Sequence, residues 1–331
     1  MTVNLSSPIE KIKNASDFIE EFKNNGNTLY VKREDLLPFC FGGNKVRLGT
    51  YYLEDAKKKG CGAMVIHGSG TSNMCRVLAA LCSREQFPCH ILTNAEDDGT
   101  YIQTCNNVLF SNCGFPVTYC DQYDEEEKLQ RIRADFEAKG LKVYYIYDDD
   151  SIPAAVQSYV DAYKEITGQA GDTPFDYIFI TLGTGITFSG LLRGQEDYVA
   201  AQKEKGKDIK VPRIVGVTIS RTTERAGEFV KKYSTLYRKE NPAVDSNVVA
   251  DFEIYGGGRL GGYGVFDDDV LAGCRTFYGN TGIGLDPIYS GKSFYAMKKY
   301  IRENNITEKK ILFVQTGSAP LFLNYAEKIF K

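Results

Sequence analysis

The sequence predicts an α/β protein whose sheets are mostly parallel. Short apolar runs of strand length alternate with helical patterns along its 331 residues. Such runs are typical of strands buried on both faces, and the alternation is typical of layered α/β folds. Several runs are followed by a glycine-rich turn that opens a helix, as in right-handed βαβ units. The length suggests about two domains.

The elements of the first half are assigned from periodicity and from turn residues. Apolar and charged residues alternate with helical spacing in the first segment, and the run that follows Gly60 is continuously apolar, as expected of a buried strand. The expected order is a helix at 9–22, a strand at 28–32, a helix at 48–60, a strand at 61–67, a helix at 76–85, a strand at 88–93, a helix at 103–112, a strand at 116–120, an acidic helix at 124–139 and a strand at 142–147.

Charge and proline at 148–153 predict a connection between two lobes. The alternation then resumes. The expected order is a helix at 154–167, a strand at 177–182, a helix from 188, a strand at 213–220, a further helix and loop, a glycine-rich region at 255–264, helices from 267 and at 290–304, and a strand at 310–315.

Composition excludes several classes of function. A net charge of −3 gives no electrostatic footprint for nucleic acid, and no apolar run is long enough to span a membrane. The nine cysteines are odd in number, lack a paired metal-ligand spacing and come without a signal peptide, so we expect free thiols in a reducing cytoplasm and no metal site.

Lys45 is the first candidate for chemistry. It follows Gly42, Gly43 and Asn44 and precedes a helical pattern, so its amine is expected at the edge of a site where a loop becomes a helix. Most lysines are ordinary surface charges. The alternative is a Schiff-base lysine, which must reach a carbonyl group and spend part of its time deprotonated.

A second candidate is the turn from Gly183 to Thr187, between the strand at 177–182 and the next helix. Small residues there let backbone N–H groups approach an anion at a helix N-terminus, which predicts a phosphate site. The spacing is neither that of a P-loop nor that of a dinucleotide fingerprint, and a tight structural turn is an equal alternative. A ligand with both an aldehyde and a phosphate is pyridoxal phosphate.

Together these motifs resemble the fold-type II pyridoxal-phosphate enzymes, in particular the group that contains D-cysteine desulfhydrase and 1-aminocyclopropane-1-carboxylate deaminase. The resemblance runs from about Leu29 to Tyr325 and rests on the segments 33–35, 42–45, 72–76, 183–187, 286–292 and 315–317. It implies a two-lobed, tryptophan synthase β-like fold with mostly parallel sheets flanked by helices. A large cofactor domain would comprise residues 1–50 and 156–331, and a small inserted α/β domain residues 51–155.

The resemblance also implies residue roles. Lys45 would bind the cofactor as a Schiff base and act as the base at the α-carbon, and Asn73 would contact the ring hydroxyl. Ser290 would face the pyridine nitrogen, where the cyclopropane-opening deaminases typically have glutamate. The implied cofactor-binding residues are Lys45, Asn73, Gly183, Thr184, Gly185, Thr187, Ser290 and Thr316, and the implied catalytic residues are Lys45, Ser72, Tyr263 and Tyr289.

The implied activity is β-elimination on a small β-substituted amino acid, which releases ammonia and a 2-oxo acid. The implied assembly is a homodimer. A β-replacement synthase, a 1-aminocyclopropane-1-carboxylate deaminase and a non-catalytic phosphate-ligand binding module remain as alternatives. Ile186, Met74 and Phe266 depart from the family's usual residues, which puts the choice of substrate in doubt more than cofactor binding.

Overall fold

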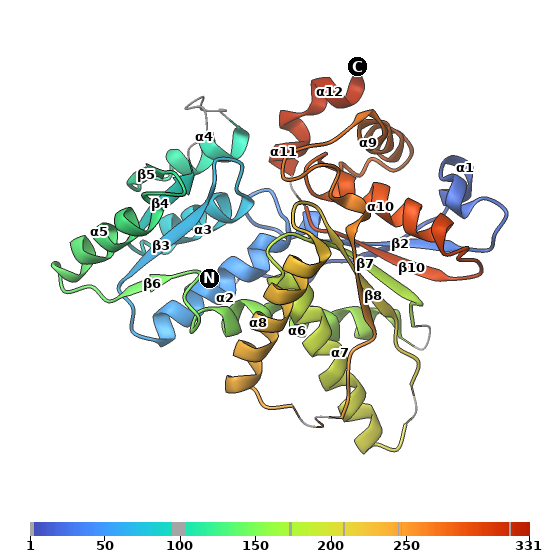
Figure 1. Cartoon of the computed structure of the whole chain (residues 1–331), viewed down its shortest axis with the longest axis horizontal. Helices are drawn as coiled ribbons and strands as arrows, with labels where there is room; N and C mark the ends of the chain where they lie inside the picture. Colours follow the sequence, from blue (N-terminus) through green and yellow to red (C-terminus); the bar gives the residue numbers. More distant parts are fainter. Residues whose placement is uncertain are drawn as a thin grey trace.

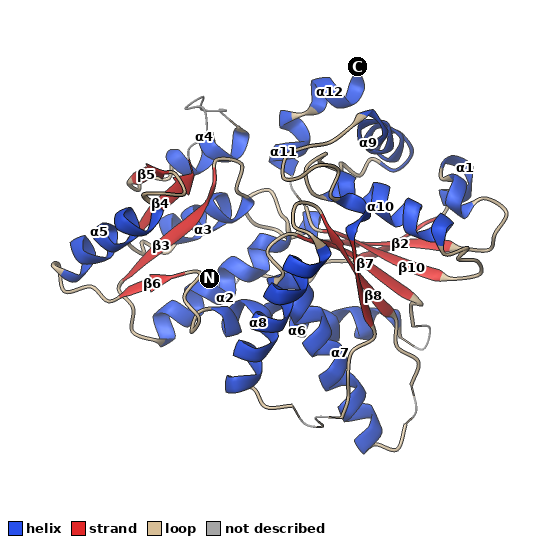
Figure 2. Ribbon diagram, viewed as in Figure 1, coloured by secondary structure: helices blue, strands red, loops and turns tan. Residues whose placement is uncertain are grey.

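The computed structural model describes residues 3–94, 104–171, 174–207, 209–243, 245, 247–317 and 319–331. Two sheets lie side by side, each flanked by helices (Figures 1 and 2). An α/β fold with mostly parallel sheets is therefore confirmed. In the part of the chain that is described, no helix is both long and apolar enough to cross a membrane, and all nine cysteines are free thiols.

The larger sheet has six strands in the order β1-β2-β10-β7-β8-β9. Only β1 runs antiparallel to its neighbour. The strands are β1 (Ile9–Ile12), β2 (Thr28–Arg33), β7 (Tyr177–Leu182), β8 (Arg213–Thr218), β9 (Phe252–Tyr255) and β10 (Lys310–Gln315). Alternate residues of β10 enter different cores. Ile311 and Phe313 pack against the helices α9 (Asp268–Thr281) and α10 (Ser290–Glu303), whereas Leu312 and Val314 pack against α6 (Ile152–Ala170) and α7 (Ile186–Glu204).

The smaller sheet has four parallel strands in the order β5-β4-β3-β6. They are β3 (Ala63–Ser69), β4 (Cys89–Asn94), β5 (Val117–Cys120) and β6 (Val143–Tyr145). All four lie in the segment that we predict to be the inserted domain. The predicted boundaries themselves fall inside α2 and α6, and the division into domains stays a prediction.

Helices cover both sheets (Figure 2). The α-helices are α1 (Ala15–Phe18), α2 (Asn44–Lys58), α3 (Asn73–Arg84), α4 (Cys105–Ser111), α5 (Glu125–Glu137), α6 (Ile152–Ala170), α7 (Ile186–Glu204), α8 (Thr223–Glu240), α9 (Asp268–Thr281), α10 (Ser290–Glu303), α11 (Ala319–Asn324) and α12 (Ala326–Phe330), and the 3-10 helices are η1 (Glu20–Phe22), η2 (Glu34–Leu36) and η3 (Gly256–Gly258). The start of the helix that we predict at 103–112 lies outside the described residues.

The prediction of one helix at 9–22 is wrong, because only the short helices α1 and η1 form there, after a strand. Residues Ile9–Ile12 form β1, which pairs with β2 from Ile9 opposite Lys32 to Ile12 opposite Leu29. Apolar residues three apart fit a helix, but the open edge of β2 offers backbone hydrogen bonds that the isolated pattern does not contain. The edge strand β9 was not expected at all, since its side chains are half-buried or exposed and show no alternation.

Candidate active site

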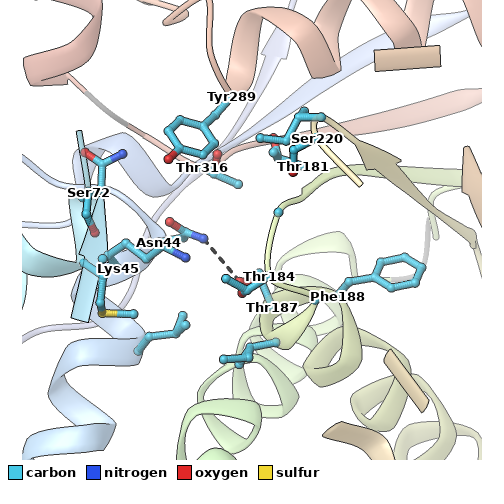
Figure 3. Close-up of a pocket in the computed structure, with 18 of the residues that line it drawn as sticks. Asn44, Lys45, Ser72, Thr181, Thr184, Thr187, Phe188, Ser220, Tyr289 and Thr316 are labelled. Carbon is cyan, nitrogen blue, oxygen red and sulfur yellow. Dashed lines mark hydrogen bonds between the residues drawn. The ribbon is translucent and has the colours of Figure 1, made fainter. Parts of the chain in front are cut away.

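A cavity of about 480 Å³ lies between the two sheets, at the carboxyl ends of strands β3, β7, β8 and β10. Ligands of parallel sheets collect at such ends. The cavity brings together residues from distant parts of the chain, and Figure 3 shows ten of them as labelled sticks. Every site residue predicted from the sequence lines it except Ser290: Lys45, Ser72, Asn73, Gly183, Thr184, Gly185, Thr187, Tyr263, Tyr289 and Thr316.

The loop before Lys45 is held by close backbone contacts. Gly42 has a φ of 67°, and a Cβ there would overlap the carbonyl oxygen of Asp35, so only glycine fits. The Gly43 N–H donates to the carbonyl of Glu34 at 2.8 Å, and the Asn44 N–H donates to that of Thr316 at 2.7 Å. Helix α2 therefore begins at a fixed place, with Lys45 in its first turn.

A buried ion pair fixes the next turn of α2. Arg47 donates to the two carboxylate oxygens of Glu34 at 2.7 and 2.9 Å, and Tyr159 of α6 donates to the same carboxylate at 2.9 Å. Burial works against the charged form of Glu34, but the Arg47 guanidinium outweighs it, so the pKa of Glu34 lies below its usual value. This pair anchors the helix that carries Lys45.

The amine of Lys45 is in an environment that raises the fraction of its neutral form. The residue is partly exposed by area, and desolvation of the amine alone lowers the pKa of Lys45 to about 8. No acidic neighbour opposes that shift. A lysine with such a pKa has a reactive fraction of neutral amine near neutral pH, as an amine that attacks an aldehyde requires.

Across the cavity from Lys45, the N-terminus of α7 forms an anion cradle (Figure 3). Gly185 is its N-cap, with a φ of 106° in the left-handed region, and the helix begins at Ile186. The first N–H groups of a helix have no partner within it and attract negative charge. Asn44 Nδ2 donates to Thr187 Oγ1 at 3.3 Å, which links the cradle to the lysine loop.

Arg221 adds a full positive charge beside this cradle. It lines the cavity just beyond the end of β8, and its Nη1 donates to the carbonyl of Gly183. Its guanidinium lies over the ring of Phe229, 4.6 Å from the ring centroid. The sequence analysis missed this residue. Its place directly after a strand end, next to Ser220, was the signal that could have found it.

A second helix N-terminus faces the cavity from the smaller sheet. Ser72 is the N-cap of α3, and its hydroxyl oxygen accepts from the Cys75 N–H at 3.2 Å. The hydroxyl of Ser72 can still donate its proton to a ligand. Asn73 Oδ1 accepts from Asn106 Nδ2 at 2.9 Å, which orients the amide of Asn73. This end of the cavity can hold a second anionic group, such as a carboxylate.

Hydroxyl groups form the remaining wall. Tyr263 OH lies 2.7 Å from Tyr289 OH, 2.7 Å from Thr71 Oγ1 and 3.2 Å from Ser69 Oγ. Burial raises the pKa of Tyr289 well above its usual value, and the neighbouring Tyr263 adds to the effect. Tyr289 is therefore a protonated phenol at neutral pH, able to donate a hydrogen bond.

Ser290 is placed differently from the other predicted site residues. It is fully buried and does not line the cavity. Its hydroxyl donates to Asp286 Oδ2 at 2.7 Å. Burial raises the pKa of Asp286, which favours the neutral acid there. A contact between Ser290 and a pyridine nitrogen stays a prediction.

Possible metal ligands approach one another once among the described residues. Ligand atoms of His67, Cys120 and Glu125 lie within 4.8 Å of each other, and none of these residues lines the cavity. His67 Nδ1 is 2.9 Å from Tyr145 OH, and burial lowers the pKa of His67. The expectation that the protein has no metal site stays a prediction.

The donors of the main cavity fit a molecule with an aldehyde and a phosphate. The amine of Lys45 can bond covalently to the aldehyde, and the α7 N-terminus with Arg221 matches a phosphate. Ten of the predicted contacts come from six separate segments and meet in one place. A tight turn without a ligand would not need a lysine of lowered pKa facing it and an arginine bonded to it.

Comparison with known proteins agrees with this geometry. The family model described as pyridoxal-phosphate dependent enzyme matches residues 5–317. A D-cysteine desulfhydrase of Yersinia enterocolitica is 25% identical over 99% of this chain and 96% of its own length. A D-cysteine desulfhydrase of Salmonella newport is 26% identical over 98% of this chain and 94% of its own length. The crystal structure of an ACC deaminase homologue superimposes with a TM-score of 0.81 and 26% identity, over 99% of this chain and 94% of the other. The chain belongs to the pyridoxal-phosphate dependent enzymes.

Proposed function

We propose that this protein is a pyridoxal-phosphate dependent lyase that removes the β-substituent of a small D-amino acid. For cysteine, the balanced reaction is cysteine plus water to pyruvate, hydrogen sulfide and ammonia. The observation that carries the proposal is the partly neutral Lys45 amine, with a pKa of about 8, facing the cradle of α7 across one cavity. The desulfhydrases among the relatives support the substrate class.

When bound, pyridoxal 5′-phosphate supplies the electron sink that makes the α-proton of an attached amino acid acidic. Lys45 Nζ is the group placed to take that proton, because among the described residues it is the one side-chain amine that lines the cavity, and its pKa is lowered. Ser72 and the N-terminus of α3 would hold the substrate carboxylate. The protonated phenol of Tyr289, with the hydroxyl of Tyr263 bonded beside it, would face the departing β-substituent and donate to it.

Ser290 favours elimination over the opening of a cyclopropane ring. A glutamate facing the pyridine nitrogen would favour a protonated ring and a strong electron sink. Ser290 carries no charge, and its hydroxyl is engaged with Asp286, whose pKa is raised by burial. With an uncharged side chain at this position, the cofactor would supply a weaker electron sink, which would favour substrates whose leaving group departs promptly.

A panel of substrates tests the proposal. D-Cysteine and β-chloro-D-alanine should release ammonia and pyruvate, measured with a coupled lactate dehydrogenase assay. 1-Aminocyclopropane-1-carboxylate should give no 2-oxobutyrate. Efficient 2-oxobutyrate release would contradict the argument from Ser290, and activity with the L-forms alone would contradict the stereochemical assignment. Conversion of added thiol into a new amino acid would identify a β-replacement synthase instead.

We further propose that the enzyme works in the cytoplasm as a homodimer. The free cysteines support a reducing compartment, and the family resemblance supports the dimer. Sedimentation equilibrium of the cofactor-loaded protein would contradict the dimer if it gave the mass of a single chain.

A further inference from the structure

Lys292, in the first turn of α10, has its ammonium group enclosed by backbone carbonyl oxygens. The side chain is fully buried. Its Nζ donates to the carbonyls of Ile219 at 2.7 Å, Gly262 at 2.7 Å and Arg259 at 2.9 Å. An ammonium has three donors, so all of them are used.

These carbonyls belong to two segments that line the cavity. Ile219 directly precedes Ser220 and Arg221, and all three are in the cavity wall. Gly262 directly precedes Tyr263, which also lines the cavity. One buried amine therefore joins the loop after β8 to the glycine-rich loop at 256–264.

Few other contacts hold the glycine-rich loop beyond η3: Arg259 Nε donates to the carbonyl of Ser220 at 3.2 Å, and Leu260 packs against the core below α10. Gly261 and Gly262 have φ values of 92° and 143°, and beyond η3 the segment has no helix or strand. Its hydroxyl contacts at Tyr263 are exposed. The fully buried side chain of Lys292 bonds to two backbone carbonyls of this loop, those of Arg259 and Gly262.

The charge of Lys292 is not cancelled by a bonded carboxylate. Burial lowers the pKa of its amine to about 8, while Asp267 opposes the shift and Arg259 adds to it. At neutral pH the amine is therefore mostly protonated. A cation surrounded by carbonyl oxygens is the environment that also suits a small monovalent ion.

We propose that Lys292 is a positioning residue whose ammonium serves as an internal cation, holding the 256–264 loop and Tyr263 against the wall formed by Ile219 and Arg221. Lys292 does not itself line the cavity. It acts on catalysis through the place it gives to Tyr263, so the kinetic part of the inference rests on the proposed function. The claim that Lys292 orders the 256–264 loop does not depend on the proposed function.

The test compares three variants. Lys292→Ala removes the cation and leaves space, Lys292→Met removes the cation and fills the space, and Lys299→Met, on the exposed side of the same helix, is the matched control. Hydrogen exchange measured by mass spectrometry on peptides covering 255–266 reports the order of the loop without any need for turnover. Turnover of β-chloro-D-alanine reports the effect on catalysis.

Both Lys292 variants should lose exchange protection in the loop, with the protection of β7 and β10 unchanged. Their kcat/KM should fall on the order of tenfold to a hundredfold, because small displacements of catalytic groups cost that much. Ammonium or methylammonium chloride should restore protection and activity to Lys292→Ala and not to Lys292→Met, relative to sodium chloride. Lys299→Met should match the unmodified protein.

Unchanged loop protection in Lys292→Met would overturn the inference. Equal loss of protection throughout the larger sheet would also overturn it, since Lys292 would then support the fold as a whole. If the unmodified protein turned over none of the substrates, the proposed function would fail. The exchange data and their rescue by ammonium would still decide the role of Lys292.

Discussion

Lys45 has its reactivity set by the desolvation of one side chain. With a pKa of about 8, roughly a tenth of the amine is neutral at pH 7, against well under a thousandth for an exposed lysine. We therefore expect the rate of covalent cofactor attachment to the apo-protein to rise with pH through about 8 and then level off. Stopped-flow absorbance would measure it, and a rate still rising steeply above pH 9 would contradict this pKa.

The site of attachment provides the control for that measurement. Borohydride reduction should fix a pyridoxyl group on Lys45, which peptide mass spectrometry would locate. Lys45→Ala should show no attachment and lose at least about a hundredfold in turnover, since it lacks the proton acceptor. A label on another lysine would rule out the assignment.

At the scale of elements, the packing of α6 on α7 supports the anion cradle. A Cβ at Gly190 of α7 would overlap the Cβ of Tyr159 and lie 2.6 Å from the carbonyl oxygen of Val156, both on α6. Gly190→Ala should thus lower the free energy of unfolding by about 1–3 kcal/mol, the usual cost of overpacking. It should also weaken cofactor affinity, because the N-terminus of α7 would shift.

Gly168→Ala is the matched control for this prediction. Gly168 lies in the last turn of α6, and a Cβ there would meet nothing within 4 Å. Alanine should stabilise the helix by at most about 1 kcal/mol. Urea unfolding followed by circular dichroism compares the two variants, and equal midpoints would show that the contact of α6 with α7 is not the constraint inferred here.

At the scale of the whole molecule, hydroxyl groups connect the two sheets across the cavity. Tyr263, from the side of the larger sheet, meets Thr71, which follows β3 of the smaller one, at 2.7 Å. If the pair acts as a unit, Tyr263→Phe and Thr71→Val should each lower kcat/KM, and the double variant should lose less than the sum. The expected coupling is about 0.5–3 kcal/mol.

The stability of these variants separates a structural effect from a catalytic one. The bonds at Tyr263 are exposed, and each contributes only about 0.5–1.5 kcal/mol, so the urea midpoints should change little. Purely additive losses in kcat/KM would contradict a link that couples the two sides of the cavity.

The alternation of strands and helices could be predicted from the sequence, because apolar runs and glycine turns are local patterns that each segment carries. The strands at 177–182 and 310–315 were predicted with the bounds that the structure has. The positions of Lys45 and the α7 cradle also followed from local motifs. Local pattern failed at 9–22 and at β9, where the edge of a distant strand decides the pairing.

Which residues meet in the cavity depends on how distant segments pack. Arg221 bonds to Gly183, and Tyr263 bonds to Thr71. Lys292 bonds to carbonyls that are 30 to 73 positions away along the chain. No periodicity in the sequence encodes these contacts. The buried environment of Lys45 is likewise a property of the packed sheets, because a pKa depends on the water that the surrounding protein excludes. Local sequence chooses the elements, whereas the reactivity of the site arises from burial and from contacts between distant segments.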